Sequence, residues 1–368
     1  MRQLNSFMEL GQHVPVGLRH DPPSRHPRLP SKPGQDSLAD WPSHNDSQRL
    51  SSHSSSHTIP AAPPTSPDAR CATDADMASP GAMALQIVSD LHLEIHDDYD
   101  AYTITPHAPV LALLGDIGLV ARHRDALAAF LARHLRQFEA ILFVPGNHEA
   151  YHSSWPRTRQ ILQQFEDEVT ARRDAGDRGL GDLVVMDRQA YRLPPPGPGP
   201  GHHKVVVLGC SLFSHVPPLG ARPVQDGMND FRLTAGWDVA AHNAAHQRDR
   251  QWLNEAVTSI ERHGDPDLRI VIVSHWSPTG DARARDPRHG AARDDALASA
   301  FATDLLDDPC FRSPRVCAWA FGHTHYNCDF LVARDAIGAP PIRLLANQRG
   351  YAGAGAPKFD PAKVLLIE

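Results

Sequence analysis

Five short motifs in this chain carry the side-chain types that proteins use to bind metal ions. In chain order they are Asp90-Leu91-His92, Gly115-Asp116, Gly146-Asn147-His148-Glu149, Ser274-His275 and Gly322-His323-Thr324-His325. Two cations about 3.5 to 4 Å apart need a ligand in common, and a carboxylate can bridge them while reducing their mutual repulsion. Asp116 is the best candidate for that bridge. The motifs therefore indicate a dinuclear metal centre.

The spacing within the motifs supports shared ions. Residues i and i+2 of an extended segment point to the same side, so Asp90 and His92 are expected to hold one ion together, and His323 and His325 have the same spacing. Taken singly each motif is weak, because a histidine after a strand, such as His275, is usually a satisfied core or loop residue. Five motifs in succession, each at the end of an apolar run, favour a metal centre over unrelated polar strand ends.

The elements that must position these motifs are short buried strands. Nine apolar runs from Ala84 onward predict them: ALQIVSD, VLALLGD, AILFVPGNH, LVVMD, KVVVLGCS, RIVIVSH, VCAWAFGH, IRLLAN and KVLLIE. Apolar residues at three- and four-residue spacing predict helices over 121–138, 155–171, 239–262 and 293–307, and Pro- and Gly-rich composition predicts loops over 172–182 and 194–203. This is an α/β pattern, in which the carboxyl ends of the strands can gather distant residues in one crevice.

The first 83 residues differ in composition from the rest. They are rich in Ser, Pro and His, and their apolar residues are too sparse to offset the entropy of ordering a backbone. We therefore expect a disordered tail over 1–83 and a folded domain over 84–368. No apolar run reaches the roughly 18 to 20 residues of a membrane span, no secretory signal is evident, and five cysteines without a CxxC pair fit a reducing compartment. These features predict a cytoplasmic protein without a membrane partner.

As a set, the motifs resemble the pattern D-x-H, GD, GNH(E/D), H and GHxH of the calcineurin-like metallophosphoesterase superfamily. The resemblance runs from about Leu85 to the NQRGY segment near Tyr351, and WAFGHTHYNCDF and LLANQRGY are most similar to fungal cytosolic members. The resemblance implies the metallo-dependent phosphatase fold, a four-layer α/β/β/α sandwich of two mixed β-sheets flanked by helices.

The resemblance also implies a role for each motif residue. His148 would face the scissile phosphate and protonate the leaving group, and Glu149 would orient nearby groups. Two divalent ions would share Asp116, and their donor set suits Mn, Fe or Zn more than Ca or Mg. The first ion would be held by Asp90, His92, Asp116 and His325, and the second by Asp116, Asn147, His275 and His323.

The implied reaction is direct hydrolysis of a phosphoester. A hydroxide that bridges the two ions would attack phosphorus in line, and Asn147 would help to neutralise charge on the phosphate oxygens. His148 would protonate the departing oxygen, without a covalent intermediate. Protein Ser/Thr phosphatases carry an arginine clamp in GDxVDRG and another in RGNHE, whereas this chain has GDIGLV and PGNHE. We therefore expect a small-molecule or nucleotide substrate, a diester in preference to a monoester.

Some polar residues have two interpretations. Arg122 and Arg124 could replace the missing clamps, but on a predicted helix they are better explained as solvated surface charge. Arg349 could bind the substrate, or it could form a salt bridge elsewhere. On another predicted helix, His242, His246 and Asp249 share one face. That face could be a further metal site, but we favour a structural or supporting role because the ligand set is already complete.

Two other functions are weighed against this one. A nuclease of the same superfamily would need a groove with Lys, Arg and interleaved aromatic residues, which a net charge of −7 and 7% aromatic residues do not favour. Nucleic acid is thus not expected as a partner. A catalytically silent scaffold on the same fold, similar to the phosphoesterase-like subunit of the retromer coat, would lack several motif residues, and here every position is filled. The oligomeric state stays open.

Overall fold

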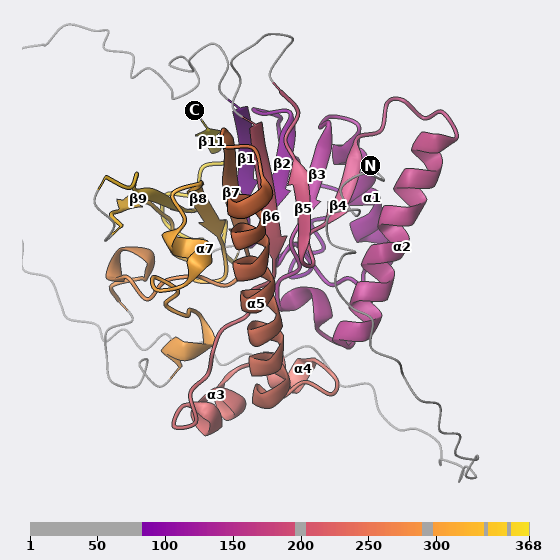
Figure 1. Cartoon of the computed structure of the whole chain (residues 1–368). Helices are drawn as coiled ribbons and strands as arrows, with labels where there is room; N and C mark the ends of the chain where they lie inside the picture. Colours follow the sequence, from indigo (N-terminus) through magenta and orange to yellow (C-terminus); the bar gives the residue numbers. More distant parts are fainter. Residues whose placement is uncertain (1–82, 196–203, 289–296, 335–337, 352–354, 368) are drawn as a thin grey trace, which may run out of the picture. The chain divides into compact units, whose positions relative to one another are not determined.

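A computed structural model describes residues 83–195, 204–288, 297–334, 338–351 and 355–367 (Figure 1). The predicted tail, 1–83, lies outside these residues except for Met83, which begins the first strand. In the described part, eleven strands form two sheets, with the orders β11-β1-β2-β3-β4 and β5-β6-β7-β8-β10-β9. The strands are β1 (Met83–Val88), β2 (Val110–Leu113), β3 (Ala140–Phe143), β4 (Asp182–Val185), β5 (Gln189–Arg192), β6 (Lys204–Cys210), β7 (Leu268–Ser274), β8 (Val316–Phe321), β9 (Cys328–Val332), β10 (Ile342–Ala346) and β11 (Val364–Ile367).

Both sheets are mixed. In the first, β1 to β4 are parallel and β11 is antiparallel to β1. In the second, β6, β7, β8 and β10 are parallel, and the edge strands β5 and β9 are antiparallel to their neighbours. The nine predicted strands are confirmed. The two that the sequence analysis missed, β5 and β9, are edge strands with no fully buried residue, so they lack a continuous apolar run.

Helices cover the outer faces of the sheets. Helices α1 (Arg124–Leu135) and α2 (Trp155–Asp174) lie beside the five-stranded sheet, and α5 (Val239–His263) lies along the six-stranded one (Figure 1). Side chains cap two of them, because Ser154 accepts a hydrogen bond from Arg157 N and Asp238 accepts one from Ala241 N. Shorter elements are α3 (Ala221–Gly227), α4 (Asp230–Leu233), α7 (Pro309–Arg312) and the 3₁₀ turns η3 (His148–Ala150), η4 (Ala282–Ala284) and η5 (Ala298–Ala300).

Alternating strand residues build three apolar layers between these elements. Residues such as Leu142 and Val273 lie between the two sheets. The opposite faces of the strands pack against helices, with Phe143 contacting the α1–α2 layer and Ile272 the α5 layer. This is the predicted four-layer α/β/β/α sandwich. Among the described residues, no helix combines the length and apolar composition needed to cross a bilayer.

One predicted helix is wrong over its described residues, and another is longer than predicted. Of the helix expected over 293–307, residues 293–296 lie outside the described part, and the remainder contains only the single turn η5. Ser277 explains the difference: its N–H donates to Phe301 O at 3.3 Å and its carbonyl accepts from Thr303 N at 3.1 Å, so these backbone groups are not free for a helix. Helix α2 continues to Asp174, so the first residues of the loop predicted over 172–182 are helical. Of the loop predicted over 194–203, residues 196–203 lie outside the described part.

Phe130 tests the layer between α1 and the first sheet. Its side chain is fully buried, so Phe130→Ala is expected to lower the free energy of unfolding by about 3 to 5 kcal/mol. Urea denaturation followed by circular dichroism measures this change. The control is Leu219→Ala, since Leu219 is 97% exposed and its loss should change stability by at most about 0.5 kcal/mol. Equal stability of the two variants would contradict the assigned core.

Candidate metal centre

The five motifs come together at the carboxyl ends of strands from both sheets. Asp90, Asp116 and Asn147 follow β1, β2 and β3, whereas His275 and His323 follow β7 and β8. The cluster contains three overlapping groups of three residues. Within each group, the potential ligand atoms lie within 4.8 Å of one another. These groups are Asp90, His92 and His325; His92, Asp116 and His148; and Asp116, His275 and His323.

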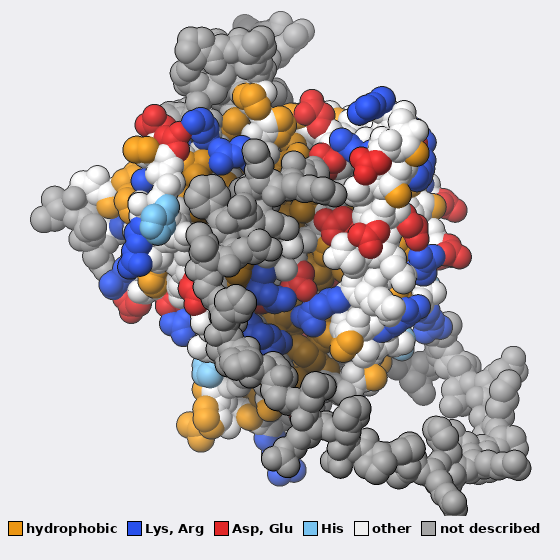
Figure 2. Space-filling model, turned by 45° about the vertical axis from the view of Figure 1, so that its right-hand side comes forward, with side chains coloured by type: hydrophobic (Ala, Val, Ile, Leu, Met, Phe, Trp, Pro, Cys, Tyr) orange, Lys and Arg blue, Asp and Glu red, His pale blue; other side chains and the backbone are white. Residues whose placement is uncertain are grey.

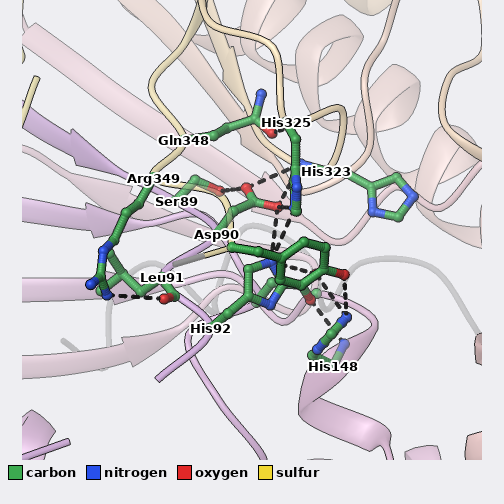
Figure 3. Close-up of polar contacts among 12 residues, drawn as sticks. Ser89, Asp90, Leu91, His92, His148, His323, His325, Gln348 and Arg349 are labelled. Carbon is green, nitrogen blue, oxygen red and sulfur yellow. Dashed lines mark hydrogen bonds and ion pairs between the residues drawn. The ribbon is translucent and has the colours of Figure 1, made fainter. Parts of the chain in front are cut away.

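Asp116 lies between two halves of the cluster. Its Oδ2 is 4.0 Å from His92 Nε2, and its Oδ1 is 3.5 Å from His275 Nε2. On the His92 side, Asp90 Oδ1 is 3.3 Å from His325 Nε2, and the Nε2 atoms of His92 and His325 are 3.0 Å apart (Figure 3). The two oxygens of one carboxylate thus face different imidazoles, which is the arrangement that a bridging ligand needs.

The other half of the cluster contains Asn147, His275 and His323. Asn147 Oδ1 is 3.0 Å from His275 Nε2, and His275 Nδ1 donates to the carbonyl of Leu114 at 2.7 Å, which directs Nε2 into the cluster. The Nε2 atom of His323 is buried and has no hydrogen-bond partner among the described residues. A cation would satisfy such a nitrogen. The donor atoms present therefore fit divalent metal ions.

The charges of the cluster suit cation binding. Burial alone would raise the pKa of Asp90, but hydrogen bonding to His325 and the nearby imidazoles hold it at about 2. The pKa of Asp116 also lies well below its usual value, because the neighbouring His275 and His148 outweigh the effect of burial. Burial, followed by repulsion from His275, lowers the pKa of His323 well below its ordinary value. Ionised Asp90 and Asp116 and a neutral His323 are the protonation states that metal ligation requires. Burial lowers the pKa of His275 but the charge of Asp116 raises it to about 10, so His275 would release a proton on binding an ion.

The backbone of the motifs is unusual. Asp90, His92, Asp116, His323 and His325 all have φ between 48° and 69°, in the left-handed region that non-glycine residues rarely adopt. The reasoning that an extended segment aligns Asp90 with His92 is therefore wrong, although the two side chains do meet. Such strained residues concentrate at functional sites.

Gly146 is required by close packing. A Cβ at this position would lie 2.4 Å from Asp116 Oδ1 and 2.8 Å from His275 Cε1. Any side chain at residue 146 would therefore push the loops of Asp116 and His275 apart.

Glu149 ties two of the motif loops together. Its carboxylate accepts backbone hydrogen bonds from Asp116 N at 2.9 Å, Ile117 N at 2.8 Å, Gly118 N at 3.3 Å and Gly146 N at 2.7 Å. Burial, followed by the charge of Asp116, raises the pKa of Glu149 to about 7. These contacts match the orienting role that the resemblance implies for Glu149.

His148 sits against the cluster in a fixed orientation. Its Nδ1 is 2.7 Å from Glu94 Oε1, so Nε2 faces the other way, 3.9 Å from Asp116 Oδ2 and 3.5 Å from the Tyr351 hydroxyl. Burial would lower the pKa of His148, but the charges of Asp116 and Glu94 raise it to about 9. Glu94 and Tyr351 were not identified from the sequence. Glu94 stands two residues after His92, and that proximity was the one signal available.

The cluster opens into a pocket of about 390 Å³. The pocket combines polar, acidic and aromatic groups with a single arginine among its described lining residues. Besides members of the cluster, the lining includes Tyr151, Met228, Asp230, Asp286, Arg288, Phe301 and Tyr351.

Arg349 is not brought to this pocket. Its guanidinium lies 4.5 Å over the ring of Tyr102, with Nη1 donating to Leu91 O at 3.3 Å and Nη2 3.8 Å from Asp98 Oδ2. Figure 3 shows the side chain pointing away from His148 and His323. Of the two interpretations given above, these contacts match the salt bridge and not substrate binding.

The other two arginines considered above also lie outside the pocket lining. Arg124 pairs with Glu168 at 3.2 Å and stacks on Phe165, and Arg122 is exposed. Both positions agree with solvated surface charge.

One face of α5, with His242, His246 and Asp249, contacts the segment next to His275. Asp249 Oδ2 accepts from Leu212 N at 2.9 Å, and His246 Nδ1 donates to Leu212 O at 3.1 Å, so both hold a residue whose φ is 74°. The adjacent Ser211 carbonyl accepts from His275 N at 3.2 Å. These contacts favour the structural interpretation over a further metal site.

Glu149→Gln tests the tie between the loops. Glutamine offers one acceptor oxygen to the four N–H donors, and each buried donor left without a partner costs about 1 to 3 kcal/mol. We expect the urea midpoint to fall accordingly. In the control Glu166→Gln, a half-buried carboxylate accepts one backbone bond, from Val185 N at 3.4 Å, so the loss should be at most about 1 kcal/mol. A Glu149→Gln midpoint no lower than that of the control would contradict the tie.

One family model and several known proteins are similar to this chain. The family model described as calcineurin-like phosphoesterase matches residues 83–327. An uncharacterized protein of Acanthamoeba polyphaga mimivirus is 24% identical over 285 residues, which cover 73% of this chain and 91% of the relative. The solved structure of a phosphopantetheinyl hydrolase from Mycobacterium tuberculosis is similar with a TM-score of 0.48 and 16% identity, covering 73% of this chain and 90% of that one. A dimetal phosphatase from Danio rerio has a TM-score of 0.37 and 15% identity, with coverage of 76% and 90%.

Proposed function

The chain belongs to the calcineurin-like phosphoesterase family, and on that premise we propose that its cluster of Asp, Asn and His side chains hydrolyses a small-molecule or nucleotide phosphoester with two divalent ions. Phosphoester hydrolysis with metal ions is the activity of the family. The observation that carries the proposal for this chain is the position of Asp116, whose two carboxylate oxygens face different halves of the cluster.

Seven side chains would hold the ions. When bound, two such ions lower the pKa of a water molecule so far that a nucleophile exists at neutral pH. Nitrogen and oxygen donors of this kind suit Mn, Fe or Zn. The first ion would take Asp90, His92, Asp116 and His325, and the second would take Asp116, Asn147, His275 and His323.

His148 would deliver the proton to the leaving oxygen. Glu94 binds its Nδ1 at 2.7 Å, which leaves the Nε2 proton directed toward the pocket. Burial lowers the pKa of His148, whereas Asp116 and Glu94 raise it to about 9 while no ion offsets the charge of Asp116. With ions bound, the hydrogen bond to Glu94 would still favour the protonated imidazole that a general acid requires. His148 also belongs to one of the groups whose atoms could hold an ion, so ligand and acid must be separated by experiment.

The pocket favours a diester over a monoester dianion. Arg288 is the one lysine or arginine among its described lining residues, and its guanidinium binds Asp286 at 2.6 to 3.1 Å. A phosphate with a single negative charge needs fewer fixed cations than a dianion. A diester or small nucleotide is therefore the proposed substrate, and the cytoplasmic location stays a prediction.

His148→Asn distinguishes an acid from a ligand. We expect two Mn²⁺ ions to remain bound while turnover of bis(p-nitrophenyl) phosphate falls about 10²- to 10⁴-fold, because the proton is no longer delivered. Metal analysis and steady-state kinetics measure the two quantities. His134→Asn is the control, since His134 is a buried histidine outside the pocket. Loss of metal from His148→Asn would refute the proton-donor role.

Asp116→Asn should affect both ions. The amide carries no charge to offset their repulsion, so we expect metal content to fall below one ion per chain and activity to be lost. Asp308→Asn is the control, because Asp308 is a buried carboxylate outside the pocket. Full occupancy with normal turnover in Asp116→Asn would remove it as the bridge.

A panel of substrates separates the proposed function from the nuclease and the scaffold. It compares phosphomonoesters, phosphodiesters, cyclic nucleotides, dinucleotides and single-stranded DNA with the Mn²⁺-loaded chain. Figure 2 shows a face on which basic side chains rim a hollow with hydrophobic side chains at its floor, so nucleic acid belongs in the panel. Preference for single-stranded DNA would favour the nuclease, and substoichiometric metal without activity would favour the scaffold.

A further inference from the structure

We propose that Asp230 is a positioning residue that, together with Tyr151, fixes the carboxamide of Asn147 so that its oxygen faces the second metal position. The inference rests on the proposed function, since it concerns a ligand of that centre. Asp230 belongs to none of the groups of described residues that could hold an ion, and no motif identified it in the sequence.

Asp230, Tyr151 and Asn147 form a closed hydrogen-bonded triangle. Asp230 Oδ1 accepts from Asn147 Nδ2 at 3.0 Å and from the Tyr151 hydroxyl at 2.5 Å. Asn147 Nδ2 also donates to the Tyr151 hydroxyl oxygen at 2.9 Å. All three side chains are at most 6% exposed, so water does not compete for these bonds. The Nδ2 amino group of Asn147 therefore faces both oxygens on one side.

The triangle determines which end of the carboxamide faces the cluster. With Nδ2 held, Asn147 Oδ1 lies 3.0 Å from His275 Nε2, on the metal side. The flipped amide would lose both hydrogen bonds and bring its oxygen against the Asp230 carboxylate. It would also present an NH₂ group, which donates hydrogen bonds and offers no lone pair to a cation. Asp230 thus selects the rotamer that can act as a ligand.

The fold brings Asp230 to this place over a long sequence separation. Asp230 and Asn147 are 83 residues apart. The segment around α4 docks on the chain just after the GNHE motif, because His152 N donates to Leu233 O and Ala235 N donates to Ser153 O, both at 2.7 Å. These backbone bonds fix Asp230 relative to Asn147. The contact is therefore built into the fold and does not depend on a flexible surface side chain.

The test measures metal binding directly. Full-length, metal-stripped protein is titrated with Mn²⁺ by calorimetry. We expect two ions on the wild type, and in Asp230→Ala one of them should bind about 10- to 100-fold more weakly. Asp230→Asn keeps an oxygen that can accept both bonds, so it should restore most of the affinity. Tyr151→Phe removes one acceptor of the amide and should weaken the same ion about two- to tenfold.

Asp308→Ala is the matched control, because it removes a buried carboxylate, bound by Arg250, outside the pocket. Unchanged Mn²⁺ affinity in Asp230→Ala, or equal weakening in Asp308→Ala, would overturn the inference. A raised KM with normal affinity would also overturn it, since Asp230 would then contact substrate. If Asp230→Ala does not fold, the Mn²⁺ affinity of Tyr151→Phe is the test. An unchanged affinity in Tyr151→Phe would then overturn the inference. Fewer than two ions on the wild type would instead count against the proposed function.

Discussion

The burial of the Asp116 carboxylate is the constraint on which the site depends. This side chain is 2% exposed, and a carboxylate removed from water needs compensating charge and hydrogen bonds. His92 and His275 approach its two oxygens, and His148 N donates to Oδ1 at 2.8 Å. Those partners come from both sheets, so the two-sheet sandwich is what allows one negative charge to be surrounded.

Much of this arrangement can be predicted from the sequence, because it depends on local patterns. Continuous apolar runs mark most of the strands, and the polar residues after five of these runs mark the motifs of the candidate site. The edge strands β5 and β9 were missed because their residues are partly exposed. The helix predicted around Phe301 was wrong because the backbone there pairs with Ser277. The position of Arg349 is likewise determined by its contacts with Asp98 and Tyr102. Sequence spacing does not predict such contacts.

The residues that orient the candidate ligands were harder to predict than the candidate ligands themselves. Glu94 and Asp230 carry common side chains in segments without a motif, and their importance comes only from the imidazole or amide that each contacts. The face of α5 that contacts Leu212 illustrates the same point. His246 and Asp249 lie on one helix face, as the spacing predicts, but their partner is the backbone of Leu212, which helical spacing cannot identify.

The left-handed conformation of five candidate ligand residues has a consequence for the handling of metals. Protein groups hold these conformations: Asp90 N donates to Gly115 O at 3.0 Å, His92 N to Asp116 O at 2.9 Å and His325 N to Gln348 Oε1 at 2.6 Å. The free energy of folding therefore offsets the strain in the backbone. Because these hydrogen bonds come from the protein alone, we expect cations of similar size to exchange without a rearrangement of the loops, so that cellular supply would decide which element is used.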